Sequence, residues 1–198
     1  YFTDINREYL NLTKTIIADS LGNINGRADF GETIFLNLVI SNLGNKDATN
    51  LSARIASSSP WITITKNSSL IGTLYGKSEV KLSGRLELKV KDNIPDRGLV
   101  TVDLFLKDNK GEQKIRIDMI IHSPKLEIVN CVIDDSESGN NNFIADPGET
   151  FSLVFQVRNL GTSSTSGQIE IQSNDNDLTI LEPNVKSGTL QFGENSFI

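Results

Sequence analysis

The sequence predicts an all-β protein made of two consecutive antiparallel β-sandwiches, the second of them truncated. Three observations carry this prediction. Apolar residues alternate with polar ones in short runs, turn residues separate these runs every 8–12 positions, and one polar loop occurs twice in the 198 residues. No segment shows helical spacing over three turns, and 37% apolar content is typical of a globular chain.

The alternating runs locate the strands in order. The first clear run follows the loop that ends at Thr33, and its apolar residues keep the parity of one strand face. These residues are Ile34, Leu36, Leu38 and Ile40, and their images in the second half are Phe151, Leu153, Phe155 and Val157. Later runs have the same period of two, at Leu86, Leu88 and Val90, at Val100, Val102, Leu104 and Leu106, and at Ile115, Ile117 and Met119. About seven or eight short strands in a first domain are expected.

A shift of 117 residues superimposes the two halves of the chain. "DSLGNINGRADFGET" (19–33) falls on "DDSESGNNNFIADPGET" (134–150), "SNLG" (41–44) on "RNLG" (158–161), and, after a one-residue slip, "IGTL" (71–74) on "SGTL" (187–190). The chain is therefore predicted to hold two copies of one domain.

The repeat sets the expected domain boundaries. Residues 1–8 have no image and are predicted to be a leader or the tail of a preceding domain, 9–122 form the first sandwich, 123–125 a junction, and 126–198 the second sandwich. The second copy lacks a counterpart of Leu82–Ile121, where three strands are predicted. A sandwich without them leaves much of its core uncovered, so we expect another segment or chain to complete it.

Charge and composition exclude several classes of function. Through His122 the chain has 16 Lys and Arg against 14 Asp and Glu, whereas the remainder has 3 against 11. This acidic part disfavours nucleic acid and anionic membranes and suits cations. The sequence has no run of 18 apolar residues, so no transmembrane segment is predicted. The single cysteine, Cys131, allows no internal disulfide.

Three short motifs carry a family resemblance. A Gly-Glu-Thr strand start, an Asn-Leu-Gly turn and the strand "DATNLSARI" (47–55) resemble the bacterial immunoglobulin-like modules called CARDB, and Trp61 is similarly placed in the related NEW3 type. The loop "NNNFIADPGET" is similar to accessory modules beside gingipain-like peptidases of secreted Bacteroidetes proteins. The resemblance implies tandem immunoglobulin-like sandwiches in an extracytoplasmic, secreted or cell-surface spacer or adhesion module without catalysis of its own.

The repeated loop is a candidate calcium site, because calcium takes six to eight oxygen ligands from a compact loop. The first loop offers Asp19, Asn23, Asn25, Asp29 and Glu32, and the second offers Asp134, Asp135, Asn140, Asn142, Asp146 and Glu149. The spacing is not that of an EF-hand. In the alternative interpretation Asn and Asp only stabilise turns, and Glu32 and Glu149 only protect a sheet edge.

Catalysis finds little support in the sequence. His122 is the only histidine, Cys131 is nine residues away, and a lone buried cysteine behaves as a small apolar residue. Hydrolase, phosphate-loop, dinucleotide and zinc-protease motifs are absent. Trp61 is either a core aromatic or an exposed platform for a sugar, and its parity against Ile62 and Ile64 leaves both open.

The predicted function is thus a non-enzymatic spacer or adhesion module stabilised by calcium, with neighbouring domains and surface proteins or glycans as partners. Accessory domains of a larger secreted peptidase and a carbohydrate- or protein-binding module are the alternatives.

Overall fold

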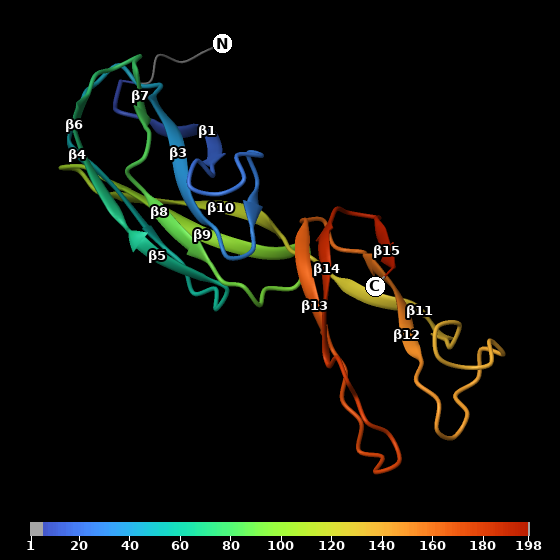
Figure 1. Cartoon of the computed structure of the whole chain (residues 1–198). Helices are drawn as coiled ribbons and strands as arrows, with labels where there is room; N and C mark the ends of the chain where they lie inside the picture. Colours follow the sequence, from blue (N-terminus) through green and yellow to red (C-terminus); the bar gives the residue numbers. More distant parts are fainter. Residues whose placement is uncertain (1–5, 198) are drawn as a thin grey trace. The chain divides into compact units, whose positions relative to one another are not determined.

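The computed structural model describes residues 6–197 and is entirely β-structure with turns (Figure 1). Its residues divide into two compact units, with the boundary between His122 and Ser123; we call them unit 1 and unit 2. The described residues contain no helix long and apolar enough to cross a membrane.

Unit 1 contains two five-stranded sheets. The first has the order β1-β3-β8-β5, with β7 also paired to β3, and the second has the order β2-β10-β9-β4-β6. All pairings are antiparallel except that of β2 with β10. The strands are β1 (Leu10–Ala18), β2 (Ala28–Asp29), β3 (Thr33–Asn42), β4 (Ala48–Ala56), β5 (Ile62–Lys66), β6 (Ser68–Leu74), β7 (Glu79–Leu82), β8 (Glu87–Val90), β9 (Gly98–Lys107) and β10 (Glu112–His122).

One core lies between the two sheets of unit 1. The predicted inward residues of β3 are 0–1% exposed, and those of β9 are equally buried. They share one apolar cluster with Leu88 of β8 and Ala53 of β4. The alternation predicted for these strands is therefore confirmed, because every second side chain faces the opposite sheet.

Unit 2 has two smaller antiparallel sheets, with the orders β11-β12-β15 and β13-β14 (Figure 1). Its strands are β11 (Leu126–Asp134), β12 (Ser152–Asn159), β13 (Thr165–Glu170), β14 (Asn184–Leu190) and β15 (Asn195–Phe197). β11 and β12 pair as β1 and β3 do, including an irregularity after Ile128 that matches the one after Leu12.

A buried asparagine organises the same turn in both units. Asn42 accepts hydrogen bonds from the N–H groups of Tyr9 (3.0 Å) and Gly44 (3.1 Å) and donates to the carbonyls of Lys46 (2.7 Å) and Leu74 (3.2 Å). The amide of Asn159 makes the same four bonds in unit 2, with Lys125, Gly161, Ser163 and Leu190. The sequence repeat did not reveal this role, which depends on strands distant along the chain.

The same turn refines the expected leader and junction. A Cβ atom on Gly44 would lie 1.8 Å from the carbonyl oxygen of Arg7, and one on Gly161 would lie 2.3 Å from that of Ser123. Residues 7–8 therefore occupy in unit 1 the place of 123–124 in unit 2, and both segments pack on their own unit. The predicted leader residues 1–5 lie outside the described residues.

Candidate functional site

The candidate site is the loop that connects β1 to β3. It begins at Asp19, whose side chain is 3% exposed and turns back beneath the loop. One carboxylate oxygen of Asp19 accepts the N–H of Asn25 at 2.7 Å, and both oxygens lie 3.2 Å from the N–H of Gly26. Gly26 has a φ of 75°, which permits these consecutive N–H groups to point at one carboxylate.

Asp29 is the second buried carboxylate of the loop, at 2% exposure. Its Oδ2 accepts hydrogen bonds from the side-chain amides of Asn23 (2.8 Å) and Asn25 (2.7 Å). Its Oδ1 is buried and has no hydrogen-bond partner within residues 6–197. A buried carboxylate oxygen without a donor or a cation is costly.

Glu32 closes the loop. Its two carboxylate oxygens accept the N–H groups of Asn23 (3.0 Å) and Asp29 (3.3 Å). Burial raises the pKa of Glu32, and the nearby carboxylates of Asp29 and Asp19 raise it further, against the lowering effect of the two N–H groups. The Glu32 side chain thus binds N–H groups of the loop. It does not protect a sheet edge, because β3 lies between β1 and β8.

The loop between β11 and β12 repeats this network bond for bond. Glu149 accepts from the N–H groups of Asn140 (3.1 Å) and Asp146 (3.4 Å), and Asp146 accepts from the amides of Asn140 and Asn142, each at 2.9 Å. Asp135 accepts the N–H groups of Asn142 and Phe143, each at 3.1 Å. Such close agreement shows that the two loops have the same conformation despite different residues between the shared ones.

Asp135, and not Asp134, is the counterpart of Asp19. Asp135 is completely buried, whereas Asp134 accepts a bond from the N–H of its neighbour Ser136 and lies outside the network. The bonds with Ser136 lower the pKa of Asp134. The 117-residue shift misses this match because the second loop has one additional residue between Asp135 and Gly139.

The two loops differ in burial. Asp29 is buried in unit 1, whereas its counterpart Asp146 is only half-buried; Glu32 and Glu149 are both half-buried. In unit 1 the loop is held against β10, because β2 pairs with it and the N–H of Phe30 donates to the carbonyl of His122 at 2.8 Å. Unit 2 has no counterpart of β10 among its described residues. The Asp29 position is therefore better shielded than that of Asp146, although the second loop contains more carboxylates.

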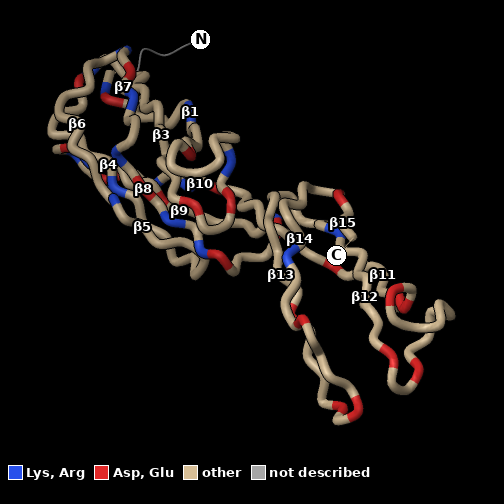
Figure 2. Tube along the Cα trace, in the orientation of Figure 1, with Lys and Arg blue, Asp and Glu red and all other residues tan. Residues whose placement is uncertain are grey.

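Charge at these loops is uncompensated. Within residues 6–197 no Lys or Arg forms an ion pair with the three carboxylates of the first loop, Asp19, Asp29 and Glu32. Figure 2 shows Asp and Glu gathered in the long loops of unit 2, where Lys and Arg are few. Oxygen-rich, anionic loops of this type have the ligand chemistry that calcium prefers.

The carboxylates alone do not form a metal centre. Among the described residues no group of three or more His, Cys, Asp or Glu side chains is arranged to hold a metal ion. A cation at the first loop would therefore need oxygens from Asn23, Asn25 or the backbone in addition to the carboxylates. The hydrogen bonds that the Asp19 and Glu32 side chains accept come from turn N–H groups, as in the alternative interpretation.

The other candidate residues do not form a reactive site. Cys131 is exposed on β11, so the expectation of a buried cysteine is wrong. Trp61 is half-buried and packs on the core of unit 1, as do Ile62 and Ile64. Strand alternation does not fix the side of Trp61, because this residue lies in the turn before β5.

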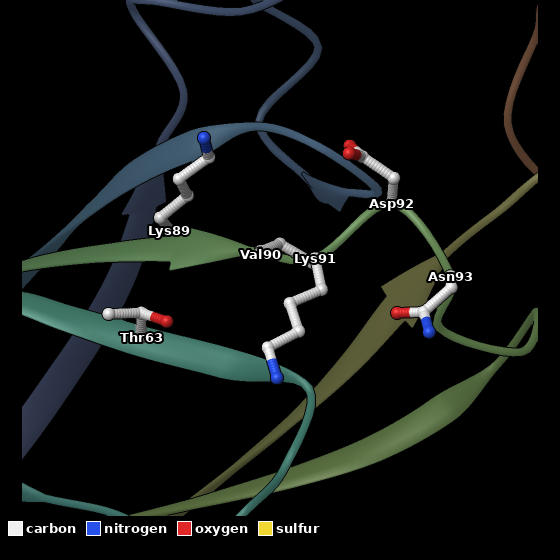
Figure 3. A pocket seen from close by; sticks show the side chains of 6 residues that line it. All are labelled: Thr63, Lys89, Val90, Lys91, Asp92 and Asn93. Atoms are coloured by element: carbon white, nitrogen blue, oxygen red, sulfur yellow. The ribbon is translucent and has the colours of Figure 1, made fainter.

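A shallow hollow lies at the end of β8 in unit 1 (Figure 3). It is lined by Thr63, Lys89, Val90, Lys91, Asp92 and Asn93. The amino groups of Lys89 and Lys91 point in opposite directions, and no side chains converge on a common point (Figure 3). The hollow thus offers no nucleophile with a base beside it.

Comparison with solved structures shows a distant likeness. No family model matches the chain, and no curated protein matches it. Among solved structures, the CsuC–CsuE chaperone–tip adhesion subunit pre-assembly complex from archaic chaperone-usher Csu pili of Acinetobacter baumannii is similar, with 10% identity, a TM-score of 0.28, and coverage of 87% of this chain and 85% of that chain. The likeness concerns the all-β fold alone. No family assignment follows from it.

The raised pKa of Glu32 gives a direct test of the loop. We expect carbon-detected NMR titration to give a pKa above the usual value of about 4.3, whereas the pKa of Glu87 should lie below its usual range because Lys66 bonds to it. Folded protein then holds the Glu32 proton to higher pH than unfolded protein, so this group lowers stability as pH rises through its folded pKa. A Glu32 pKa at or below that of Glu87 would contradict the structure.

Proposed function

We propose that the chain is a non-catalytic, extracytoplasmic tandem of immunoglobulin-like β-sandwich modules that acts as a spacer or adhesion segment, with calcium bound at the β1–β3 loop. The observation that carries the proposal is the buried Oδ1 of Asp29, which has no hydrogen-bond partner within residues 6–197, in a loop whose carboxylates form no ion pair with a Lys or Arg of that part of the chain. Its surroundings are oxygen-rich, which fits the needs of a hard divalent cation.

Calcium bound through Asp29 and neighbouring amide or backbone oxygens would offset the repulsion that the charges of Asp29 and Asp19 exert on Glu32. Asp19, Asp29 and Glu32 are drawn together by the turn, and the charges of the first two raise the pKa of the third. A divalent cation reverses this effect, because it favours the ionised form of each carboxylate. Bound calcium would then make the loop at the end of the sandwich more rigid. Rigidity suits a spacer that must hold neighbouring domains in fixed positions.

The β-structure supports a structural role more than a catalytic one. The two units share the same hydrogen-bond networks: each has one buried asparagine that organises a turn and one acidic loop. Repetition of a whole module lengthens a chain without adding new chemistry. The resemblance to CARDB-type modules supports the same proposal and its extracytoplasmic location, which surface labelling of intact source cells would test.

Calcium is expected to raise the melting temperature of unit 1. At a tenfold excess over the dissociation constant, which is about 10⁻⁴–10⁻³ M for extracellular modules, the gain is about 1.4 kcal/mol, or roughly 7 °C for a domain of ~100 residues. Trp61 is the only tryptophan and belongs to unit 1, so its fluorescence reports this transition in the full chain.

Asp29→Asn should abolish the calcium effect, because it removes the negative charge at the unpartnered Oδ1 while keeping the side chain's shape. Asp134→Asn is the matched control and should leave the rise intact, since Asp134 lies outside both networks. An unchanged melting temperature in millimolar calcium, or the same rise in Asp29→Asn, would leave the loop as a plain turn.

A further inference from the structure

An open groove of about 330 Å³ lies at one end of unit 1. One wall is the segment that leads into β1, and the other is the turn that connects β9 to β10. These strands belong to different sheets, so the groove lies between the ends of the two sheets. Its volume is in the lower part of the range of small-molecule sites, which is about 300–1,000 Å³.

Two buried leucines and one exposed aromatic residue line the groove. Leu10 and Leu106 are 7% and 1% exposed and belong to the core cluster, whereas Tyr9 is 44% exposed. The face of an aromatic ring is negatively polarised, so it attracts the C–H groups of a sugar ring. Sites for small molecules combine such an apolar surface with a few polar groups.

Polar side chains without partners line the same groove. They include the guanidinium of Arg7, the carboxylate of Glu112 and the amide of Gln113. Among residues 6–197 these three groups form no hydrogen bond or ion pair, and neither does the hydroxyl of Tyr9. Together they offer donors and acceptors, which matches a ligand rich in hydroxyl groups, because each hydroxyl both donates and accepts.

Both walls of the groove are fixed in position. The N–H of Tyr9 donates to the buried side chain of Asn42 at 3.0 Å. In the opposite wall, the carboxylate of Asp108 accepts the N–H of Lys110 at 2.8 Å. An ion pair between Glu8 and Lys110 joins the two walls. A groove that is already ordered loses less conformational entropy when a ligand binds.

The charges of the lining side chains are nearly balanced. Two cations, Arg7 and Lys110, lie with three anions, Glu8, Asp108 and Glu112. Such a lining has no strong field of one sign, so it disfavours highly charged ligands of either sign. A neutral ligand with many hydroxyl groups fits these side chains best.

The aromatic residue of the groove is not required by the turn that holds it. In unit 2 the N–H that donates to Asn159 belongs to Lys125, as the N–H of Tyr9 donates to Asn42. The bond comes from the backbone in both units, so the turn accepts a side chain without a ring. The ring of Tyr9 is therefore available for a ligand.

We propose that this groove binds a short neutral saccharide, with Tyr9 stacked against the sugar ring and the three unpartnered polar side chains bonded to its hydroxyl groups. This ligand class goes beyond the proposed spacer role and gives the adhesion role its partner. The nine residues of β1 separate the groove from the β1–β3 loop, a distance of roughly 30 Å at the rise of a strand. Sugar binding therefore does not require calcium.

The test measures sugar binding by the full chain in a buffer that contains a calcium chelator. An array of neutral and acidic glycans gives the preferred class, and calorimetric titrations with lactose, maltose, cellobiose and chitobiose give dissociation constants. We expect a neutral sugar to bind. Tyr9→Ala should weaken this binding by about tenfold or more, because it removes the stacked ring. Tyr9→Phe keeps the ring and should retain most of the affinity.

Tyr75→Ala is the matched control. Tyr75 is an exposed tyrosine of unit 1, at 64%, and it does not line the groove, so its replacement should leave the affinity unchanged. The fluorescence of Trp61 verifies that unit 1 remains folded in each variant. Equal affinity of Tyr9→Ala and the original chain would overturn the proposal, as would an absence of binding on the array and in all four titrations.

Two further outcomes would overturn the proposal in favour of another ligand or place. Binding restricted to acidic glycans and lost in Arg7→Ala would indicate an anion site. Binding that appears only in calcium and disappears in Asp29→Asn would place the sugar at the β1–β3 loop. A melting temperature that does not respond to calcium leaves the sugar titrations unaffected, so the two proposals fail separately.

Discussion

Leu36→Ala is expected to lower the free energy of unfolding of unit 1 by roughly 2–5 kcal/mol. Leu36 is completely buried in the centre of β3, and β3 lies between β1 and β8, so no neighbouring strand is free to collapse into the cavity. Denaturant unfolding followed by the fluorescence of Trp61 measures this loss, because the tryptophan packs on the same core.

Leu153→Ala is the matched control. Leu153 holds the same position in β12, but it is only half-buried. Its replacement should leave the Trp61 transition unchanged, since it belongs to unit 2. A loss below about 1 kcal/mol for Leu36→Ala, smaller than core substitutions produce, would indicate that the two sheets of unit 1 are not closely packed.

Asn42→Ala is expected to destabilise unit 1 by about 3 kcal/mol, because it leaves buried polar groups without partners. The N–H groups of Tyr9 and Gly44 lose their acceptor, and the carbonyls of Lys46 and Leu74 lose their donor. Asn42 is completely buried, so water cannot replace these bonds without opening the turn.

Asn37→Ala serves as the control for Asn42→Ala on the same strand. The Asn37 side chain accepts one exposed bond, from the N–H of Gly84 at 2.9 Å, and its loss should cost less than about 1 kcal/mol. Comparable losses for the two variants, again measured through Trp61, would show that the buried network contributes little.

Local pattern was sufficient to predict much of this fold. The strands β3, β8, β9 and β10 follow from apolar residues at every second position, because each strand has one face in the core and one in solvent. The duplication was equally visible, since the two loops share their Asn, Asp and Glu residues at nearly constant spacing. The all-β fold with antiparallel sheets is confirmed; its immunoglobulin-like character remains a proposal.

Long-range contacts account for what the sequence left open. The roles of Asn42 and Asn159 depend on strands about 30 residues away, and the place of Trp61 depends on the turn before β5. The match of Asp19 with Asp135 becomes visible only when the hydrogen bonds of the two loops are compared. Residue spacing alone does not distinguish Asp134 from Asp135 as the counterpart of Asp19, because a one-residue insertion leaves the composition of the loop unchanged.

The acidic loops show which features the sequence determines and which depend on the tertiary structure. By itself, the sequence determined that the chain repeats one β-rich module and that each copy carries a loop rich in carboxylates and amides, because strand periodicity and composition are local properties. Only the tertiary structure decided which buried carboxylate keeps an oxygen without a hydrogen-bond partner among the described residues, and this is Asp29 in unit 1. Burial and pairing depend on strands that meet in space, and no local pattern encodes which strands these are.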